Sequence, residues 1–334
     1  IYKTEQRLTN TVANSDGWYY PEFVLGEDSK RVIVLGDRSV QGLQVAKEEN
    51  IGWLLNQAYL EEGETEIISL GYPDRGPGLY LDPVLLDFAI EAYEPDEIIV
   101  LFDFRNDFQT ATRAQRGVIF FEENEEGVID IHPNSFGVRH HFQHQVIRAY
   151  EGFQPNRFIE NHYITPRFIS QIINPPAVQA AGTQLENNSA LGLDNAFVFN
   201  AESNEVALKV AEAQLEMAFD HLESQGISMK VVTIPVYPKP FFEQFSGDDW
   251  APNLEQSNLF LPEQELEAFA LENGIPWLSM GNHMQQSGVT VEQIKSFYFG
   301  NDGQLTAAGH QFFAEAVESC FIAETAVSGC HLSE

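Results

Sequence analysis

Basic residues are scarce in this chain. Its 334 residues include 18 lysines and arginines against 50 aspartates and glutamates, which gives a formal net charge of -32 at pH 7. A protein that binds along a phosphate backbone needs a basic face, and a membrane with anionic lipids attracts the same kind of surface. The composition therefore argues against nucleic acid and anionic membranes as partners. A saline habitat would select the same acidity, and the sequence does not separate these causes.

Long apolar runs and cysteines are also rare. No run of about 18 apolar residues occurs, so the sequence predicts no membrane-spanning helix. Because the chain opens at Ile1, we expect a trimmed or mature product, with a signal peptide or membrane anchor before this residue. The two cysteines, Cys320 and Cys330, lie ten residues apart, and we expect a disulfide formed in an extracytoplasmic, oxidising compartment. Two unpaired thiols are the alternative.

Predicted strands and helices alternate along the first hundred residues. Residues 1–30 form an irregular lead-in, whose aromatic stretch "GWYYPEF" we expect to pack on the domain rather than to serve a partner. The β-branched run Arg31–Leu35 stops at Gly36 and predicts a central strand. Further strands are expected at 65–71 and 96–104, with helices at 45–60 and 82–95. Such alternation is typical of a parallel sheet with helices on both faces.

A long insertion interrupts this alternation at residues 109–200. It begins with "GVIFFEENEEGVIDIHP", which predicts a β-hairpin, and we interpret the whole segment as a cap region. The alternation resumes with helices expected at 203–225, 262–273 and 306–320 and strands at 229–236 and 275–280. We therefore expect one domain over residues 31–334, a three-layer α/β/α fold with a doubly wound, mainly parallel sheet of the flavodoxin type.

Four sequence blocks stand next to these predicted elements. They read "GDRSVQG" after the first strand, "LGYPDRGPG" after the second, "FRND" after the third and "NDGQLTAAGH" before the last helix. In this order they resemble the blocks of the SGNH (GDSL-type) hydrolase superfamily, in particular its exported, membrane-anchored branch. The resemblance covers roughly residues 31–317 and implies an SGNH-like fold.

The same resemblance implies that the catalytic groups are lost. In the family a serine attacks an acyl carbonyl while a histidine takes its proton. Arg38 stands at the serine position, and a guanidinium remains protonated and has no lone pair with which to attack. Gln304 stands at the histidine position, and an amide is no general base near neutral pH. Asn106 matches the family's oxyanion residue. Asp302 matches the family's aspartate in a D-x-H spacing, whereas a D-x-x-H spacing places Asn301 at that position.

Two nearby residues are alternative catalytic groups. Ser39 follows the arginine, but we expect it to cap a helix, because Gly42 keeps its family spacing from Arg38. His310 lies in the last helix, where we expect a surface histidine. An active esterase or O-acetyltransferase on a glycan, using Ser39 or an unforeseen nucleophile, remains the alternative function.

Three arginines follow the first three strands. Arg38, Arg75 and Arg105 should meet at the carboxyl edge of the sheet, where doubly wound folds bind ligands. With Asn106 they are candidates for binding an anionic or carbohydrate ligand, because guanidinium groups pair with carboxylates, sulfate and phosphate. The competing interpretation is local ion pairing with the many neighbouring aspartates, above all a salt bridge from Arg38 to Asp302 that fills the old active site.

Neither a metal nor a cofactor is predicted. His140 and His144 lie one helical turn apart, but no further ligand completes the pair, so we expect surface histidines. The acidic run Glu122–Gly127 lacks the alternating ligands of a calcium loop. Our hypothesis is a catalytically inactive SGNH-like protein that serves as an exported binding module, or as a subunit that docks on a protein partner in a larger assembly.

Overall fold

The structure is a computed structural model. It describes residues 14–23, 29–62, 65–72, 77–104, 107, 120–123, 129–132, 201–235, 261–299, 303–323 and 327–332.

A six-stranded sheet forms the centre of the molecule, in the order β2-β1-β3-β6-β7-β8. Its strands are β1 (Lys30–Gly36), β2 (Thr65–Gly71), β3 (Glu97–Asp103), β6 (Ser228–Ile234), β7 (Trp277–Leu278) and β8 (Cys330–His331). All neighbours pair in parallel except β8, which runs antiparallel to β7. The predicted doubly wound, mainly parallel sheet is therefore confirmed. In the register, Gly36 at the end of β1 stands beside Gly71 at the end of β2.

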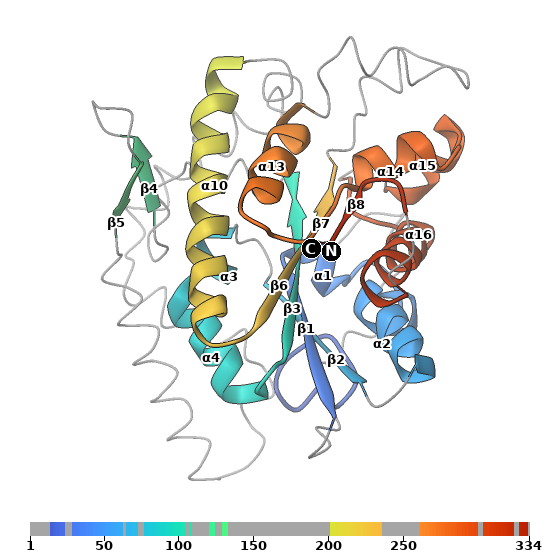
Figure 1. Cartoon of the computed structure of the whole chain (residues 1–334). Coiled ribbons are helices and arrows are strands. Elements are labelled where there is room, and N and C mark those ends of the chain that lie inside the picture. Colours follow the sequence, from blue (N-terminus) through green and yellow to red (C-terminus); the bar gives the residue numbers. More distant parts are fainter. Residues whose placement is uncertain are drawn as a thin grey trace, which may run out of the picture.

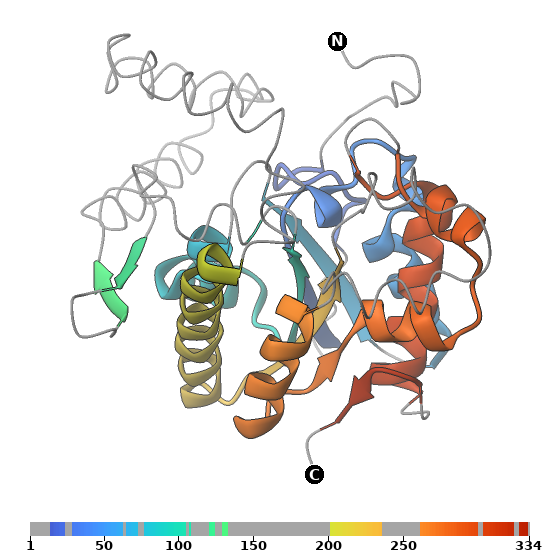
Figure 2. The same ribbon diagram turned by 90° about the horizontal axis from the view of Figure 1, so that it is seen from above.

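Helices cover both faces of the sheet and complete three layers (Figure 1). One face carries α2 (Ile51–Glu62), α14 (Met280–Gln286), α15 (Val291–Phe297) and α16 (Ala307–Val317). The other face carries α3 (Pro77–Tyr80), α4 (Pro83–Tyr93), α10 (Ala201–Ser224) and α13 (Leu261–Glu272). Seen from above, the two groups of helices lie on opposite sides of the strands (Figure 2).

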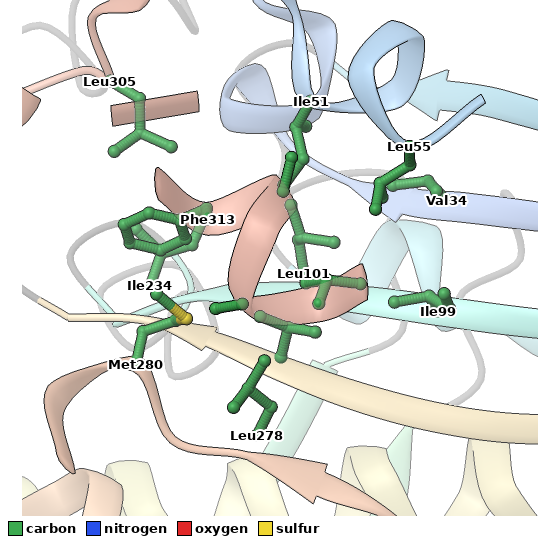
Figure 3. Packing of buried hydrophobic residues seen from close by; sticks show 14 of the residues in the cluster. Val34, Ile51, Leu55, Ile99, Leu101, Ile234, Leu278, Met280, Leu305 and Phe313 are labelled. Atoms are coloured by element: carbon green, nitrogen blue, oxygen red, sulfur yellow. The ribbon is translucent and has the colours of Figure 1, made fainter. Parts of the chain in front are cut away.

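Two apolar cores fill the spaces between the layers. Alternate residues of a strand point to opposite faces, so Val34 of β1 joins the core under α2 and α16, while Ile33 joins the core under α4 and α10. Because both faces are buried, β1 and β3 consist of nearly continuous apolar residues. Figure 3 shows the first core, where side chains of β1, β3, α2, α16 and β7 meet.

Several element boundaries differ from the expectation. Helix α2 begins at Ile51 rather than near residue 45, because Lys47–Glu49 form a 3-10 turn and Asn50 Oδ1 then accepts a hydrogen bond from Gly52 N at 2.8 Å. Helices α14 and α15 and strand β8 were not anticipated. The expected hairpin is confirmed as the antiparallel pair β4 (Phe120–Glu123) and β5 (Ile129–His132). The remainder of the 109–200 insertion lies outside the described residues.

The aromatic lead-in packs on the domain, as expected. Tyr20 donates from its hydroxyl to the carbonyl of Gly52 in α2 at 3.2 Å, and Trp18 Nε1 donates to the Tyr93 hydroxyl in α4 at 2.9 Å. The Trp18 ring also meets Tyr72 edge to face, with centroids 5.2 Å apart. Because α2 and α4 belong to opposite layers, this segment bridges both layers beside the edge strand β2.

A disulfide holds the opposite edge of the sheet. Cys320 lies in a π-helical turn, η3 (Glu318–Ile322), directly after α16, and its sulfur is bonded to that of Cys330 in β8. The backbone adds a hydrogen bond of 2.8 Å from Ser279 N to Gly329 O. The two-residue strand β8 is therefore tied to α16 as well as to β7.

Candidate functional site

The turn after β1 builds the centre of the candidate site. The short helix α1 (Arg38–Gln41) follows at once, and Asp37 caps it by accepting a hydrogen bond from Ser39 N at 2.8 Å. Gly42 ends it in the left-handed region at φ 58° and donates from its N–H to the Arg38 carbonyl at 2.8 Å. A Cβ on Gly71 would lie 2.2 Å from Gln41 N, so only glycine lets the end of β2 approach α1 this closely.

Arg38 therefore begins α1 at the carboxyl end of the central strand β1. Its side chain is half-buried. This is the position at which the SGNH blocks place their nucleophilic serine. A guanidinium there stays positively charged and offers no electron pair to an acyl carbonyl. The structure thus places Arg38 directly after β1, as expected, and its assignment to the family's serine position stays a prediction.

Gln304 occupies the second degenerate position. The residue is 2% exposed, and its main-chain carbonyl oxygen accepts a hydrogen bond from Phe299 N at 2.7 Å. Leu305 beside it forms an antiparallel bridge with Tyr298. Two residues later Thr306 caps α16 by accepting from Gly309 N at 3.2 Å. The structure shows that Gln304 is buried, and its match to the family's histidine position stays a prediction.

The other predicted site residues lie outside the described residues. They are Arg75, Arg105, Asn106, Asn301, Asp302, His140 and His144. The expected salt bridge from Arg38 to Asp302 and the expected cluster of three arginines therefore remain predictions.

The structure contradicts the expectation that Ser39 caps a helix. Asp37, two residues earlier, supplies the capping oxygen. Ser39 is only 2% exposed, and its hydroxyl donates to Asp103 Oδ2 at the end of β3, at 2.9 Å. The sequence pattern favoured a serine cap, but an aspartate at the first position of the turn is an equally good acceptor and leaves the serine free to face the sheet.

Buried acidic groups gather beside this serine. Asp107 Oδ2 accepts hydrogen bonds from Asp103 N at 2.7 Å and from the Tyr80 hydroxyl at 2.5 Å. Burial, followed by the charges of Asp37 and Asp103, raises the pKa of Asp107 well above its ordinary value. Burial and the nearby Asp107 also raise the pKa of Tyr80. Sequence reasoning missed Tyr80, which follows the glycine-rich block and reaches the cluster from α3.

His310 also differs from the expectation of a surface histidine. It is 1% exposed, and its Nδ1 accepts a hydrogen bond from Ile51 N at the start of α2, at 3.3 Å. Burial lowers its pKa to about 3, so the imidazole is neutral under ordinary conditions. The neighbouring Gly309 lets α16 approach α15 closely, because a Cβ there would lie 2.2 Å from the Phe297 carbonyl oxygen.

Ser39 and His310 are therefore engaged with other groups rather than with each other. The Ser39 hydroxyl is bonded to a carboxylate, and the His310 ring accepts from the first N–H of a helix. Within the described residues, no group of three or more histidine, cysteine, aspartate or glutamate side chains is arranged to hold a metal ion.

Comparison with known proteins returns only solved structures. No family model matches the sequence, and no curated protein does. Among the similar solved structures is a putative lipolytic protein of the G-D-S-L family from Desulfitobacterium hafniense, with 11% identity, a TM-score of 0.41, and coverage of 86% of this chain and 98% of that one. A psychrotrophic esterase from Pseudoalteromonas shares 9% identity at a TM-score of 0.41, over 87% of this chain and 96% of that one.

A lipase/acylhydrolase from Enterococcus faecalis is similar to the same degree. It has 10% identity and a TM-score of 0.41, and the match covers 86% of this chain and 93% of that one. In this chain the blocks "GDRSVQG" and "LGYPDRGPG" begin at the ends of β1 and β2 in a sheet of order β2-β1-β3-β6-β7. By this sheet the chain is a three-layer α/β/α protein, and its sequence blocks resemble those of the SGNH (GDSL-type) hydrolases.

Proposed function

We propose that this chain is a catalytically inactive SGNH-like binding module. The observation that carries the proposal is the guanidinium of Arg38 at the head of α1, where acyl transfer needs a hydroxyl. Gln304 adds to it, because a buried amide accepts no proton near neutral pH. Both partners of the proton transfer that starts ester cleavage are replaced, and the surrounding turn keeps its shape.

An active enzyme would need another nucleophile and another base. Ser39 follows Arg38 directly, yet it is almost fully buried, and its hydroxyl donates a hydrogen bond to Asp103. A carboxylate is a much weaker base than an imidazole, so this bond does little to activate a serine. His310, the alternative base, has its Nδ1 lone pair engaged by α2. These contacts favour the binding module over the esterase or O-acetyltransferase.

The carboxyl edge of the sheet is the proposed binding surface. Ligands of doubly wound folds bind outside the carboxyl ends of the strands, and Arg38 stands there half-exposed. We propose that Arg38, with Arg75, Arg105 and Asn106, contacts an anionic or carbohydrate ligand or an acidic segment of a protein partner.

The proposed location is extracytoplasmic. The Cys320–Cys330 disulfide supports it, because such bonds persist mainly in oxidising compartments. In the part of the chain that the structure describes, no helix combines the length and apolar character needed to cross a membrane. Attachment to a membrane would therefore depend on a segment outside these residues.

Hydrolysis of short acyl esters tests the loss of activity. The purified chain is incubated with p-nitrophenyl acetate and butyrate, and release of p-nitrophenol is compared with buffer and with the Ser39→Ala variant. We expect no turnover above buffer for either protein, because the hydroxyl that remains is buried and bonded to Asp103. Turnover by the unmodified chain that Ser39→Ala abolishes would overturn the proposal.

A double substitution is the matched positive variant. Arg38→Ser together with Gln304→His restores both groups of the family pattern, whereas Arg38→Ser alone restores only one. Hydrolysis by the double variant and not by the single one would support the view that the scaffold is intact and that only these two groups were lost.

A further inference from the structure

A buried carboxyl group ties the first turn of α13 to the sheet. Glu263 is fully buried, and its Oε1 is the acceptor for three donors. These are the Thr233 hydroxyl, the Ser279 hydroxyl at 2.9 Å and the Gly281 backbone N–H at 3.1 Å. Glutamate is almost never buried so completely without a cationic partner, so this arrangement calls for an explanation.

The three donors come from separate elements. Thr233 lies at the carboxyl end of β6, and Ser279 and Gly281 lie where β7 passes into α14. Ser279 also caps α14 by accepting from Asn282 N. Figure 1 shows α13 beside β6 and β7. Glu263 therefore joins α13, β6 and α14 at one point of the carboxyl edge.

The second oxygen of the same carboxyl group has a different environment. Glu263 Oε2 is buried and has no hydrogen-bond partner among the residues that the structure describes. A buried charge is stable only when it is paired and hydrogen-bonded. In the ionised carboxylate of Glu263, the Oε2 atom would meet neither condition. Burial accordingly raises the pKa of Glu263 to about 7, against an opposing effect of its three hydrogen bonds.

The charged groups that face this carboxyl are few. Glu267, one turn along α13, adds a negative charge, and it is itself bonded to His331 of β8 at 3.0 Å and to Asn282 at 2.9 Å. From β6 and α14 the contacts are the hydroxyls and the N–H already named, which are neutral. On α10, Glu212 interacts with Glu265 and Glu272 of α13.

We propose that Glu263 is a proton-operated lock that holds the start of α13 to the ends of β6 and β7. In the neutral form the group is tolerated in the interior. In the ionised form the unpaired oxygen carries buried charge, and local opening, which admits water, relieves it. The lock contributes fully below the ordinary pKa of 4.5 and is lost as the pH rises through 7.

Amide hydrogen exchange measured by NMR tests the lock. The Gly281 N–H donates directly to Glu263, and its exchange rate, corrected for the intrinsic pH dependence, gives the local opening constant. We expect that constant to rise by up to about tenfold per pH unit between about pH 5 and pH 7, and to level off above. In Glu263→Gln, which keeps the shape and cannot ionise, the constant should not change with pH.

Two further variants keep the test decisive. Glu265→Gln removes an exposed carboxylate from the same helix and should keep the pH dependence of the unmodified chain. Glu267→Gln removes the neighbouring negative charge and should move the midpoint to lower pH without abolishing the change. An opening constant that is independent of pH in the unmodified chain, or equally dependent on pH in Glu263→Gln, would overturn the proposal.

Discussion

At the scale of single residues, the turn after β1 has a well-defined backbone but presents an arginine side chain. Asp37 caps α1, Gly42 ends it and Gly71 lets β2 approach, so these three residues fix the course of the backbone in the turn. The side chain that this backbone presents is Arg38. An arginine at this position offers no attacking atom for acyl transfer.

A second residue-scale feature is the buried amide of Gln214 on α10. Gln214 is fully buried, and within the described residues neither its Nε2 nor its Oε1 has a hydrogen-bond partner. A buried polar group without a partner costs about 1 to 3 kcal/mol. We therefore predict that Gln214→Met, of similar length and helix propensity, raises the free energy of unfolding by about 1 kcal/mol or more in urea titrations.

The control for this prediction is Glu216→Met, an exposed position on the same helix. It introduces the same side chain without relieving a buried amide, so its effect should stay within about 0.5 kcal/mol. Equal effects of the two substitutions, or a loss of stability in Gln214→Met, would show that the amide is satisfied in solution.

At the scale of elements, α16 and α2 are joined through a neutral imidazole. His310 accepts the first N–H of α2, and its pKa lies near 3 in the folded protein against an ordinary 6.5. Below pH 6.5 the His310 imidazole binds a proton in the unfolded chain but not in the folded protein. The contribution of His310 to stability is therefore lost as the pH falls from 6.5 towards 3, by up to about 1.4 kcal/mol per pH unit.

The variant His310→Asn tests this contact between α16 and α2. The asparagine amide oxygen can still accept a hydrogen bond from Ile51 N, but the amide does not titrate. Unfolding free energies measured between about pH 7 and pH 4.5 should fall more steeply in the unmodified chain than in His310→Asn. Glu263 acts in the opposite direction over part of this range, because its raised pKa favours the folded protein at lower pH. The comparison is therefore best repeated in the Glu263→Gln background, and parallel curves there would contradict the assignment.

The elements also show what the sequence predicts well. Long apolar runs identified β1, β2 and β3, and helical spacing identified α4, α10 and α13 to within a few residues. Short elements escaped prediction because tertiary contacts create them. Helices α14 and α15 have seven residues each and depend on capping side chains, and β8 has two residues that pair only with β7.

At the scale of the whole molecule, contacts near both ends of the sheet join segments that are distant in the sequence. The lead-in bridges the layers beside β2 through Trp18 and Tyr20, and the Cys320–Cys330 disulfide holds β8. These contacts hold both ends of the sheet to the helical layers.

The candidate site was predictable only in part for a related reason. Arg38 was placed correctly because its position follows from where β1 stops. The roles of Ser39 and His310 were wrong because the direction of a side chain depends on packing across β3 and α2, which are distant in sequence. Local patterns fix where a turn lies, and tertiary contacts decide which of its side chains are buried.

The central claim is that this SGNH-like scaffold has no activated serine, and reaction with an alkyl fluorophosphonate followed by intact-mass analysis tests it most directly. Such reagents bond covalently to a serine only when a base activates its hydroxyl. We predict an unchanged mass for the unmodified chain. A stoichiometric phosphonyl adduct, at Ser39 or at any other serine, would contradict the account.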